Sequence, residues 1–255
     1  MNRGIYTATS GGMAAERRME VVSNNLANVN TAGFKGQRIV ARQQEFADTL
    51  ASIIATTPKY APSDQRDTPG VVEINAETNF TAGPIHYTGN PLDVALTEQD
   101  GFFAIQVGEE TLYTKAGNFT LNANRELVTH DGYAVLGTNG TITFPADGRA
   151  SISENGTVLS DTTRIDQLRI VNIADKSQME RTDGTRFRLL NDDDATELVE
   201  YRLTPGSIEM PNVSTVGSMV EMISTSRAFE AYTKIVHTLD DINTKVISTV
   251  RNGNG

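Results

Sequence analysis

Regular heptad spacing at both ends of the chain is the feature that most constrains its fold. Near the N-terminus the spacing alternates between 3 and 4 at Ile5, Ala8, Gly12, Ala15, Met19, Val22, Leu26 and Val29. Near the C-terminus the same alternation runs through Phe229, Tyr232, Val236, Leu239, Asn243, Val246 and Val250. A sustained 3–4 alternation predicts long helices that bury one stripe. Such a stripe is also compatible with a helix lying on the core of its own domain.

The composition of the two stripes favours helix pairing. Small residues such as Gly12 in the first stripe permit close approach of another helix, and the polar Asn243 in the second can fix its register. We therefore expect the terminal helices to pair with each other, as a coiled-coil-like stalk, and with neighbouring copies. Ser214 is the predicted N-cap of the C-terminal helix.

The middle of the chain has the pattern of a β domain. Apolar residues alternate with others at Phe103, Ile105 and Val107, and turn sequences such as "HDG", "TNG", "ADG" and "ENG" recur about every ten residues. The sequence predicts an α+β fold with an inserted, mainly antiparallel sandwich or barrel-like domain. Its expected parts are an N-terminal helical assembly segment (1–35), an extended linker or arm (36–79), the β domain (80–205) and a C-terminal helical assembly segment (206–255).

The stretch "SNNLANVN" places several asparagines near the end of the first helix. Asparagine is a mediocre helix former because its amide competes for backbone hydrogen bonds. An uncharged amide can donate and accept at once, so we expect Asn24, Asn25 and Asn28 to contact other subunits. The alternative is a frayed helix end with ordinary capping amides. The heptad spacing predicts that the helix reaches residue 29 or 30 and that Gly33 stops it.

Composition excludes several classes of function. The net charge of −10 argues against a nucleic-acid or anionic-membrane binder, and the absence of cysteine excludes disulfides and thiolate metal sites. The first residues contain no apolar stretch of the kind found in cleaved signal peptides, and no run of apolar residues approaches membrane-spanning length. Export, if it occurs, is expected to use a route without a cleaved signal.

No catalytic, cofactor or metal-binding pattern stands out. His86, His130 and His237 lack ligand spacing and are expected at surfaces or interfaces. Residues 192–194, a run of three aspartates, lack the spacing of a calcium loop and are expected in a solvated turn. Glu98, Asp100, Glu126 and Asp131 could supply a glycosidase pair in principle, but no motif supports one. We expect no enzyme, no cofactor and no metal.

Motifs in three separated regions, in order, resemble those of the bacterial flagellar rod and hook proteins. "SNNLANVNTAGFK" matches the signature SNNxANxxTxGFK at every specified position, including Gly33, Phe34 and Lys35. Upstream, "YTATSGGM" is similar to the family's YxAxSGM with one extra glycine. Residues 88–137 are similar to the family's central β motif, and residues 221–242 resemble its C-terminal helix, with Tyr232 in place of the usual asparagine.

The resemblance implies a structural subunit of the rod that crosses the periplasm. Such subunits are exported through the flagellar type III apparatus and assemble with themselves, with neighbouring axial proteins and against the bushing rings. The chain length sets aside the longer hook proteins and the smallest rod subunits. The absence of a recognisable extra stretch in residues 36–79, and "MPNVSTV" in place of an "NSNVN"-type sequence before the last helix, favour the proximal-rod branch over the distal-rod branch. Two other classes stay open from the residues alone: an adhesin whose helical ends dimerise, and a secreted enzyme acting on cell-wall glycan.

Overall fold

The computed structural model describes residues 2–43, 72–191, 195–198 and 201–252, and the chain divides into two compact units. Unit 1 comprises residues 1–26, 37–77 and 215–255, and unit 2 comprises residues 27–36 and 78–214. Side chains are described except in residues 2–7, 41–43, 72–74 and 243–252 of these ranges. The run of aspartates at 192–194, predicted to form a solvated turn, lies outside the described residues.

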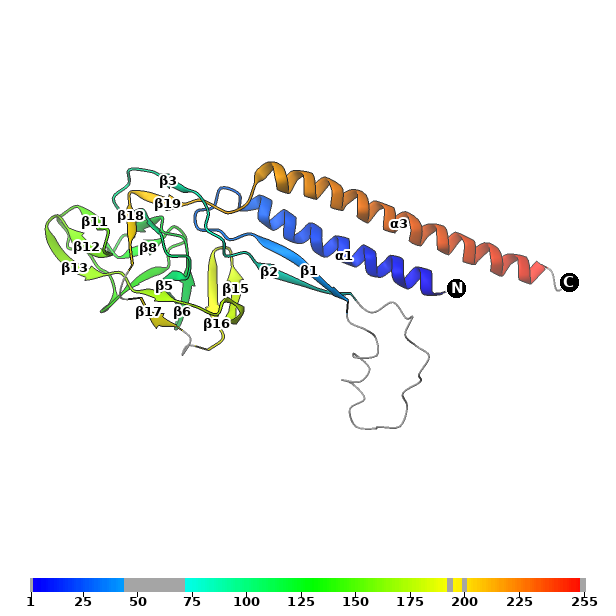
Figure 1. Ribbon diagram of the computed structural model, residues 1–255, viewed down its shortest axis with the longest axis horizontal. Helices are drawn as coiled ribbons and strands as arrows, with labels where there is room; N and C mark the ends of the chain where they lie inside the picture. The colour runs from blue at the N-terminus through cyan, green and yellow to red at the C-terminus, as the bar shows by residue number, and fades with distance from the viewer. Residues whose placement is uncertain (1, 44–71, 192–194, 199–200, 253–255) are drawn as a thin grey trace, which may run out of the picture. The chain divides into compact units, whose positions relative to one another are not determined.

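Unit 1 contains two long helices and a two-stranded sheet (Figure 1). The helices are α1 (Asn2–Ala27) and α3 (Thr215–Asn252), and the strands are β1 (Gln37–Gln43) and β2 (Val72–Thr78). Two interior glycines, Gly11 and Gly12, weaken α1 as an isolated helix because each costs about 1 kcal/mol relative to alanine. Helix α1 therefore depends on packing within unit 1.

Unit 2 is built almost entirely of short strands. They are β3 (Ile85–Tyr87), β4 (Val94–Leu96), β5 (Gly101–Val107), β6 (Glu110–Thr114), β7 (Phe119–Leu121), β8 (Leu127–Thr129), β9 (Ala134–Gly137), β10 (Gly140–Thr141), β11 (Ala150–Ile152), β12 (Thr157–Ser160), β13 (Thr163–Gln167), β14 (Ile170–Asn172), β15 (Met179–Asp183), β16 (Arg186–Leu189), β17 (Thr196–Glu197), β18 (Leu203–Pro205) and β19 (Ser207–Glu209). One turn of 3₁₀ helix, η1 (Lys176–Gln178), precedes β15.

A ten-stranded sheet dominates unit 2. Its main path runs β15-β16-β6-β5-β9-β8-β7, with β10 on β9, β14 on β5 and β17 on β14. A three-stranded sheet has the order β11-β12-β13, and two-stranded sheets pair β18 with β4 and β19 with β3. The strand pairs of unit 2 with a described register are antiparallel, as the frequent turn signals predict.

Strand β5 is the centre of the core because both of its faces are buried. Phe103 and Ile105 point into one apolar cluster, whereas Phe102 and Ala104 point into a second cluster with Phe187. All of these side chains are fully buried. The sequence alternation at Phe103 and Ile105 identifies only one of the two faces, since Phe102 and Ala104 break the apolar–polar pattern expected of a one-sided sheet.

The α+β class with a large antiparallel sheet domain and two long helices is confirmed. The predicted end of the first helix is wrong: α1 ends at Ala27, a turn covers residues 28–30, and Gly33 lies well beyond it. In the stretch expected as a linker, the described residues form β1 and β2. Among the described helices, none has the length and apolarity needed to cross a membrane.

Candidate functional site

The predicted stripe of α1 is largely buried within unit 1. Ala8, Ala15 and Val22 are 5%, 7% and 2% exposed. Gly12, Met19 and Leu26 are half-buried, as is Val29 in the turn after the helix, while the side chain of Ile5 is outside the described set. Small side chains on a buried stripe allow the backbone of a second helix to come close.

The stripe of α3 that faces α1 is less buried than the stripe of α1. Phe229, Tyr232, Val236 and Leu239 are half-buried, and Ser218 and Thr225 extend the same stripe toward the start of the helix as buried residues. The side chains of Asn243, Val246 and Val250 are outside the described set. Ser214, the predicted N-cap, immediately precedes α3.

Gly11 and Tyr232 fit together as a hole and a knob. A Cβ atom on Gly11 would lie 2.5 Å from Cε1 and 2.7 Å from Cζ of Tyr232, so the ring occupies space that any other residue at position 11 would fill. A Cβ on the adjacent Gly12 would meet only Cβ of Tyr232, at an ordinary 3.8 Å. The extra glycine and Tyr232 were both noted in the sequence, and the structure shows that Gly11 and Tyr232 contact each other.

An exposed ion pair adds a second contact between the helices. Arg18 donates from Nη2 and Nε to Oε1 of Glu221, at 2.7 and 2.9 Å. The two side chains are 55% and 42% exposed, so water screens the pair. We expect it to orient the helices rather than to contribute much stability.

Helix α3 also carries an apolar face that points into solvent, which we call the root face. It consists of Val216, Met219, Val220 and Ile223, which are 72%, 49%, 61% and 55% exposed. At 100° per residue these positions lie on the side of the helix opposite the buried Ser218 and Thr225. The first turns of α3 therefore bury the side that carries Ser218 and Thr225 and leave the opposite, apolar side exposed.

Asn25 anchors the end of α1 to the start of β1 within unit 1. Its Oδ1 accepts a hydrogen bond from Gln37 N at 2.8 Å, and its Nδ2 donates to Gln37 O at 2.7 Å. The side chain is 9% exposed, so this amide satisfies both backbone groups of one residue, as a strand neighbour would. Asn25 thus makes a contact within the chain, and its expected contact with another subunit stays a prediction.

The other two asparagines differ from Asn25 in exposure. Asn28 is half-buried, and its Oδ1 accepts a hydrogen bond from Thr31 Oγ1 at 3.2 Å in the turn after α1. Asn24 is exposed. The role of both residues in subunit contact stays a prediction.

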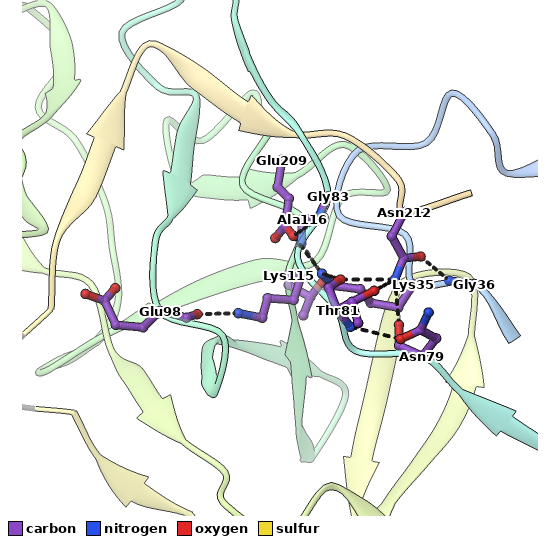
Figure 2. A network of polar contacts seen from close by, with 11 residues as sticks. Lys35, Gly36, Asn79, Thr81, Gly83, Glu98, Lys115, Ala116, Glu209 and Asn212 are labelled. Atoms are coloured by element: carbon purple, nitrogen blue, oxygen red, sulfur yellow. Dashed lines mark hydrogen bonds and ion pairs between the residues drawn. The ribbon is translucent and has the colours of Figure 1, made fainter. Parts of the chain in front are cut away.

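In unit 2, three segments distant in sequence meet in a buried polar cluster, which we call the junction (Figure 2). The segments are residues 31–36, 79–84 and 207–212. Lys35 Nζ lies 2.6 Å from Glu209 Oε1 and donates to Thr81 O at 2.8 Å. The same Oε1 accepts from Gly83 N at 2.8 Å, and the side chains of Lys35 and Glu209 are 1% and 5% exposed. This is a desolvated ion pair with additional hydrogen bonds, the arrangement that makes burial of charge tolerable.

Asn212 joins the same three segments through a neutral amide (Figure 2). Its Oδ1 accepts from Gly36 N at 2.7 Å, and its Nδ2 donates to Asn79 O at 2.8 Å and to Thr81 O at 3.0 Å. Backbone bonds reinforce the junction, with Gly33 N donating to Glu209 O at 2.7 Å. The point where the chain enters the β domain is thus bonded to the point where it leaves.

Phe34 and Arg181 attach the signature loop to β15. Phe34 is fully buried, and the guanidinium carbon of Arg181 lies 4.7 Å from its ring centre and 5.1 Å from that of Phe187. Arg181 also donates to Lys35 O and, at 2.8 Å, to Gly184 O. Burial lowers the pKa of Arg181 to about 10, so it stays charged at neutral pH between two aromatic faces.

Gly33 is required by close packing of backbone against backbone. Its φ is +70°, and a Cβ there would overlap the backbone of Lys115 and Ala116. Any other residue would combine an unfavourable backbone conformation with a clash that no side chain can relieve. This explains the glycine of the signature without any role in ending the helix.

Lys115 is a second buried cation beside the junction (Figure 2). It is 2% exposed, donates from Nζ to Glu98 O at 2.6 Å and lies 4.9 Å from the ring centre of Phe102. Burial, opposed only in part by the charge of Glu209, lowers its pKa from 10.5 to about 8. Lys115 therefore carries its charge at neutral pH at a cost to the folded state.

The residues considered for chemistry are either exposed or bonded to neighbouring groups of the β domain. His86, His130 and His237 are exposed. Glu98 accepts a hydrogen bond from Arg202 N at 2.9 Å, Glu126 accepts from Asn122 Nδ2 at 2.7 Å, Asp100 pairs with Lys176, and Asp131 is exposed. Among the described residues, no group of three or more acids or histidines could hold a metal ion.

The sequence prediction missed the partners that complete the junction. Lys35 was visible as the last residue of the signature, but Glu209, Asn212 and Arg181 carry no local mark of their roles. Only the alternation at β19, where Ser207 and Glu209 are buried and Ile208 is less so, hints that an acid faces inward. That signal contradicts the usual preference for apolar residues inside, so it was not usable without the fold.

Comparison with known proteins places these features in one family. Residues 5–35 match the family model "Flagella basal body rod protein", residues 97–160 match "Flagellar hook protein FlgE/F/G D1 domain", and residues 204–249 match "Flagellar basal body rod FlgEFG protein C-terminal". The first match covers most of α1 and the signature loop. The last covers most of β18, all of β19 and most of α3.

Full-length relatives agree with these matches. The chain is 32% identical to the flagellar basal-body rod protein FlgG of Bacillus subtilis, over 98% of this chain and 100% of the relative. It is 33% identical to FlgG of Borreliella burgdorferi, over 95% and 96% of the two chains, and 30% identical to FlgF of Salmonella typhimurium, over 94% and 95%. The likeness extends over both helices, the junction and the β domain, and the chain belongs to the flagellar basal-body rod protein family.

Proposed function

We propose that this chain is a non-enzymatic structural subunit of the flagellar rod that polymerises helically through its terminal helices and transmits torque. The observation that carries the proposal is the root face of α3, which leaves four large apolar side chains about half or more exposed. Clustered apolar exposure of this kind is typical of interaction surfaces. A shaft that carries torque needs many such contacts in each subunit rather than one reactive site.

The junction supports the same role. Torque passing between the β domain and the chain ends must cross the three segments of the junction, residues 31–36, 79–84 and 207–212. These segments are held together by a buried ion pair, the Asn212 amide and a backbone bond, so load on one is shared by the others. On this proposal the seam residues and Asn24, Asn28 and Phe34 serve assembly or its support, and the β domain folds by itself.

Within the rod, we infer the proximal position, as in FlgF. Support comes from residues 36–79, which show no recognisable distal-type extra stretch, and from "MPNVSTV" at 210–216 in place of the "NSNVN"-type sequence of distal subunits. The full-length relatives include both FlgF and FlgG. The proposal extends to the other axial proteins and bushing rings as partners, and to export through the flagellar type III apparatus without a cleaved signal.

Deletion of the gene, followed by electron microscopy of isolated basal bodies, tests this function. A proximal subunit predicts non-motile cells with rods that stop near the motor ring. Loss of only the distal segment would assign the chain to the distal rod instead. Cells that remain motile with complete rods would refute the structural role and favour an adhesin or a glycan enzyme.

A further inference from the structure

A small cavity lies on the β domain, and none of its lining residues belongs to the junction. Its volume is about 180 Å³, which is room for about six water molecules at liquid density. Its walls come from the turn between β9 and β10, from residues 167–170 at the end of β13 and the start of β14, and from Glu197, Leu198 and Tyr201. The cavity is too small for a drug-sized ligand, so its size suits a molecule with few non-hydrogen atoms.

The floor of the cavity is apolar, and hydrogen bonds fix its walls. Leu168 and Ile170 line it and are both buried. Tyr201 Oη accepts a hydrogen bond from Gln167 Nε2 at 3.0 Å, and the ring lies against Gly156, where a Cβ would come within 2.5 Å of that oxygen. Walls that are held in this way form the cavity before any ligand arrives.

The charged lining consists of Arg169 and Glu197, which form a loose pair at the mouth of the cavity. Nε of Arg169 lies 3.7 Å from Oε1 of Glu197, which is beyond hydrogen-bond length. Within the described part of the chain, this Nε has no hydrogen-bond partner. The two side chains are 41% and 66% exposed, so the pair contributes little to stability and opens at small cost. The remaining donors of the guanidinium and both oxygens of the carboxylate can therefore turn to a ligand.

A molecule that carries both an anionic and a cationic group complements this pair. The planar guanidinium of Arg169 matches a carboxylate, and the carboxylate of Glu197 accepts hydrogen bonds from an ammonium group. In a free α-amino acid, standard bond lengths place the ammonium nitrogen about 3 Å from a carboxylate oxygen. This spacing is close to the 3.7 Å between the two protein groups, so one such molecule can bond to both.

Ligands with a single charge suit the cavity less well. A simple anion on Arg169 would bring its charge close to Glu197, and a simple cation on Glu197 would bring its charge close to Arg169. The apolar floor offers a place for a short aliphatic side chain, which gains from leaving water. Charge and floor together favour an aliphatic amino acid over an isolated ion.

We propose that this cavity binds a small zwitterion, namely a free α-amino acid with a short aliphatic side chain. The carboxylate of the ligand bonds to Arg169, its ammonium group bonds to Glu197, and its side chain lies on Leu168 and Ile170. The site contains no residue of the terminal helices, so it is a binding function beyond the proposed role in the rod.

Isothermal titration calorimetry of the full-length chain tests the site with L-valine and two matched probes. Isovalerate has the same carbon skeleton without the ammonium group, and isobutylamine lacks the carboxylate. The variants are Arg169→Met, which keeps the stem of the side chain, and Glu197→Gln, which keeps its shape. The control is Arg188→Met, because Arg188 forms a similarly exposed pair with Glu110 outside the cavity. Circular dichroism verifies the fold of each variant.

The zwitterion site predicts saturable binding of L-valine to wild type and to the control. Each matched probe should bind to wild type at least about tenfold more weakly, because one charge-assisted hydrogen bond is lost. L-Valine should bind to Arg169→Met and to Glu197→Gln more weakly by a similar factor, for the same reason. Glycine, which has no side chain to place on the apolar floor, should also bind roughly tenfold more weakly than L-valine.

Three outcomes would overturn the inference. A wild type without saturable binding of L-valine would show that the cavity does not take this class of ligand. Isovalerate binding as tightly as L-valine would show a plain anion site, and this comparison on wild type needs no variant. L-Valine binding unchanged in both variants would place the ligand elsewhere on the chain. The deletion strain tests the rod function separately, so failure of either proposal leaves the other standing.

Discussion

The helix contacts of unit 1 and the junction of unit 2 use similar side chains in opposite ways. Arg18 and Glu221 form an ion pair in water, whereas Lys35 and Glu209 form one that is almost completely buried and completed by backbone groups. The root face leaves apolar surface uncovered, while Phe34 in the junction is fully buried. The junction satisfies its groups within the chain, and helix α3 leaves apolar side chains exposed.

The largest effect is expected from Glu209→Ala. It leaves Lys35 charged, buried and with the Thr81 carbonyl as its remaining described partner, which should lower the free energy of unfolding by about 3–5 kcal/mol. Urea unfolding followed by circular dichroism of the β domain measures this change. The double variant Lys35→Met with Glu209→Leu should recover most of the loss, because the desolvated charges are both removed. A loss below about 1 kcal/mol for Glu209→Ala would mean that the ion pair of the junction is as solvated as the pair between Arg18 and Glu221.

The second-largest effect is expected in the pH dependence of stability, and it arises from Lys115 in unit 2. The pKa of Lys115 is about 8 in the folded chain and near 10.5 when unfolded, so the unfolded chain binds the proton more tightly. Stability should therefore rise from about pH 8 to pH 10.5, by up to roughly 3 kcal/mol. The free energy of unfolding is measured at several pH values for wild type and for Lys115→Met. The difference between the two plots against pH gives the contribution of Lys115. Parallel curves would show that Lys115 is solvated.

The sequence predicted features that depend on residues close together in the chain, and it missed contacts between residues far apart in the chain. The two helices follow from local spacing, and the antiparallel β domain follows from turns recurring along the chain, so both were predictable. Glu209 with Lys35 and Arg181 with Phe34 join residues more than a hundred positions apart, and no local pattern marks them. Gly33 shows the same limit: its conformation suggested a helix stop, but the backbone it approaches is that of Ala116.

A smaller effect on stability is expected from substitutions at two adjacent glycines of α1, and the two should change stability in opposite directions. Gly11→Ala forces a Cβ into the ring of Tyr232, and the overpacking cost of about 1–3 kcal/mol exceeds the helix-propensity gain of about 1 kcal/mol. Gly12→Ala has room for its Cβ and should gain up to about 1 kcal/mol from propensity alone. Thermal melting of the helical dichroism measures both. Tyr232→Asn should remove the penalty of Gly11→Ala, and a penalty that persists would place its cause elsewhere than the knob and hole.

The smallest effect is expected at the ion pair between the helices. Arg18→Ala, Glu221→Ala and the double variant should each change the free energy of unfolding by about 0.5 kcal/mol or less, because both groups are already solvated. A double-mutant cycle from urea unfolding gives the coupling energy, and 0.5 M salt should abolish what coupling there is. The same cycle at Lys35 and Glu209 should give a coupling several times larger and nearly independent of salt. Equal couplings would mean that burial does not separate the two regions, and the contrast between a closed junction and an open helix surface would fail.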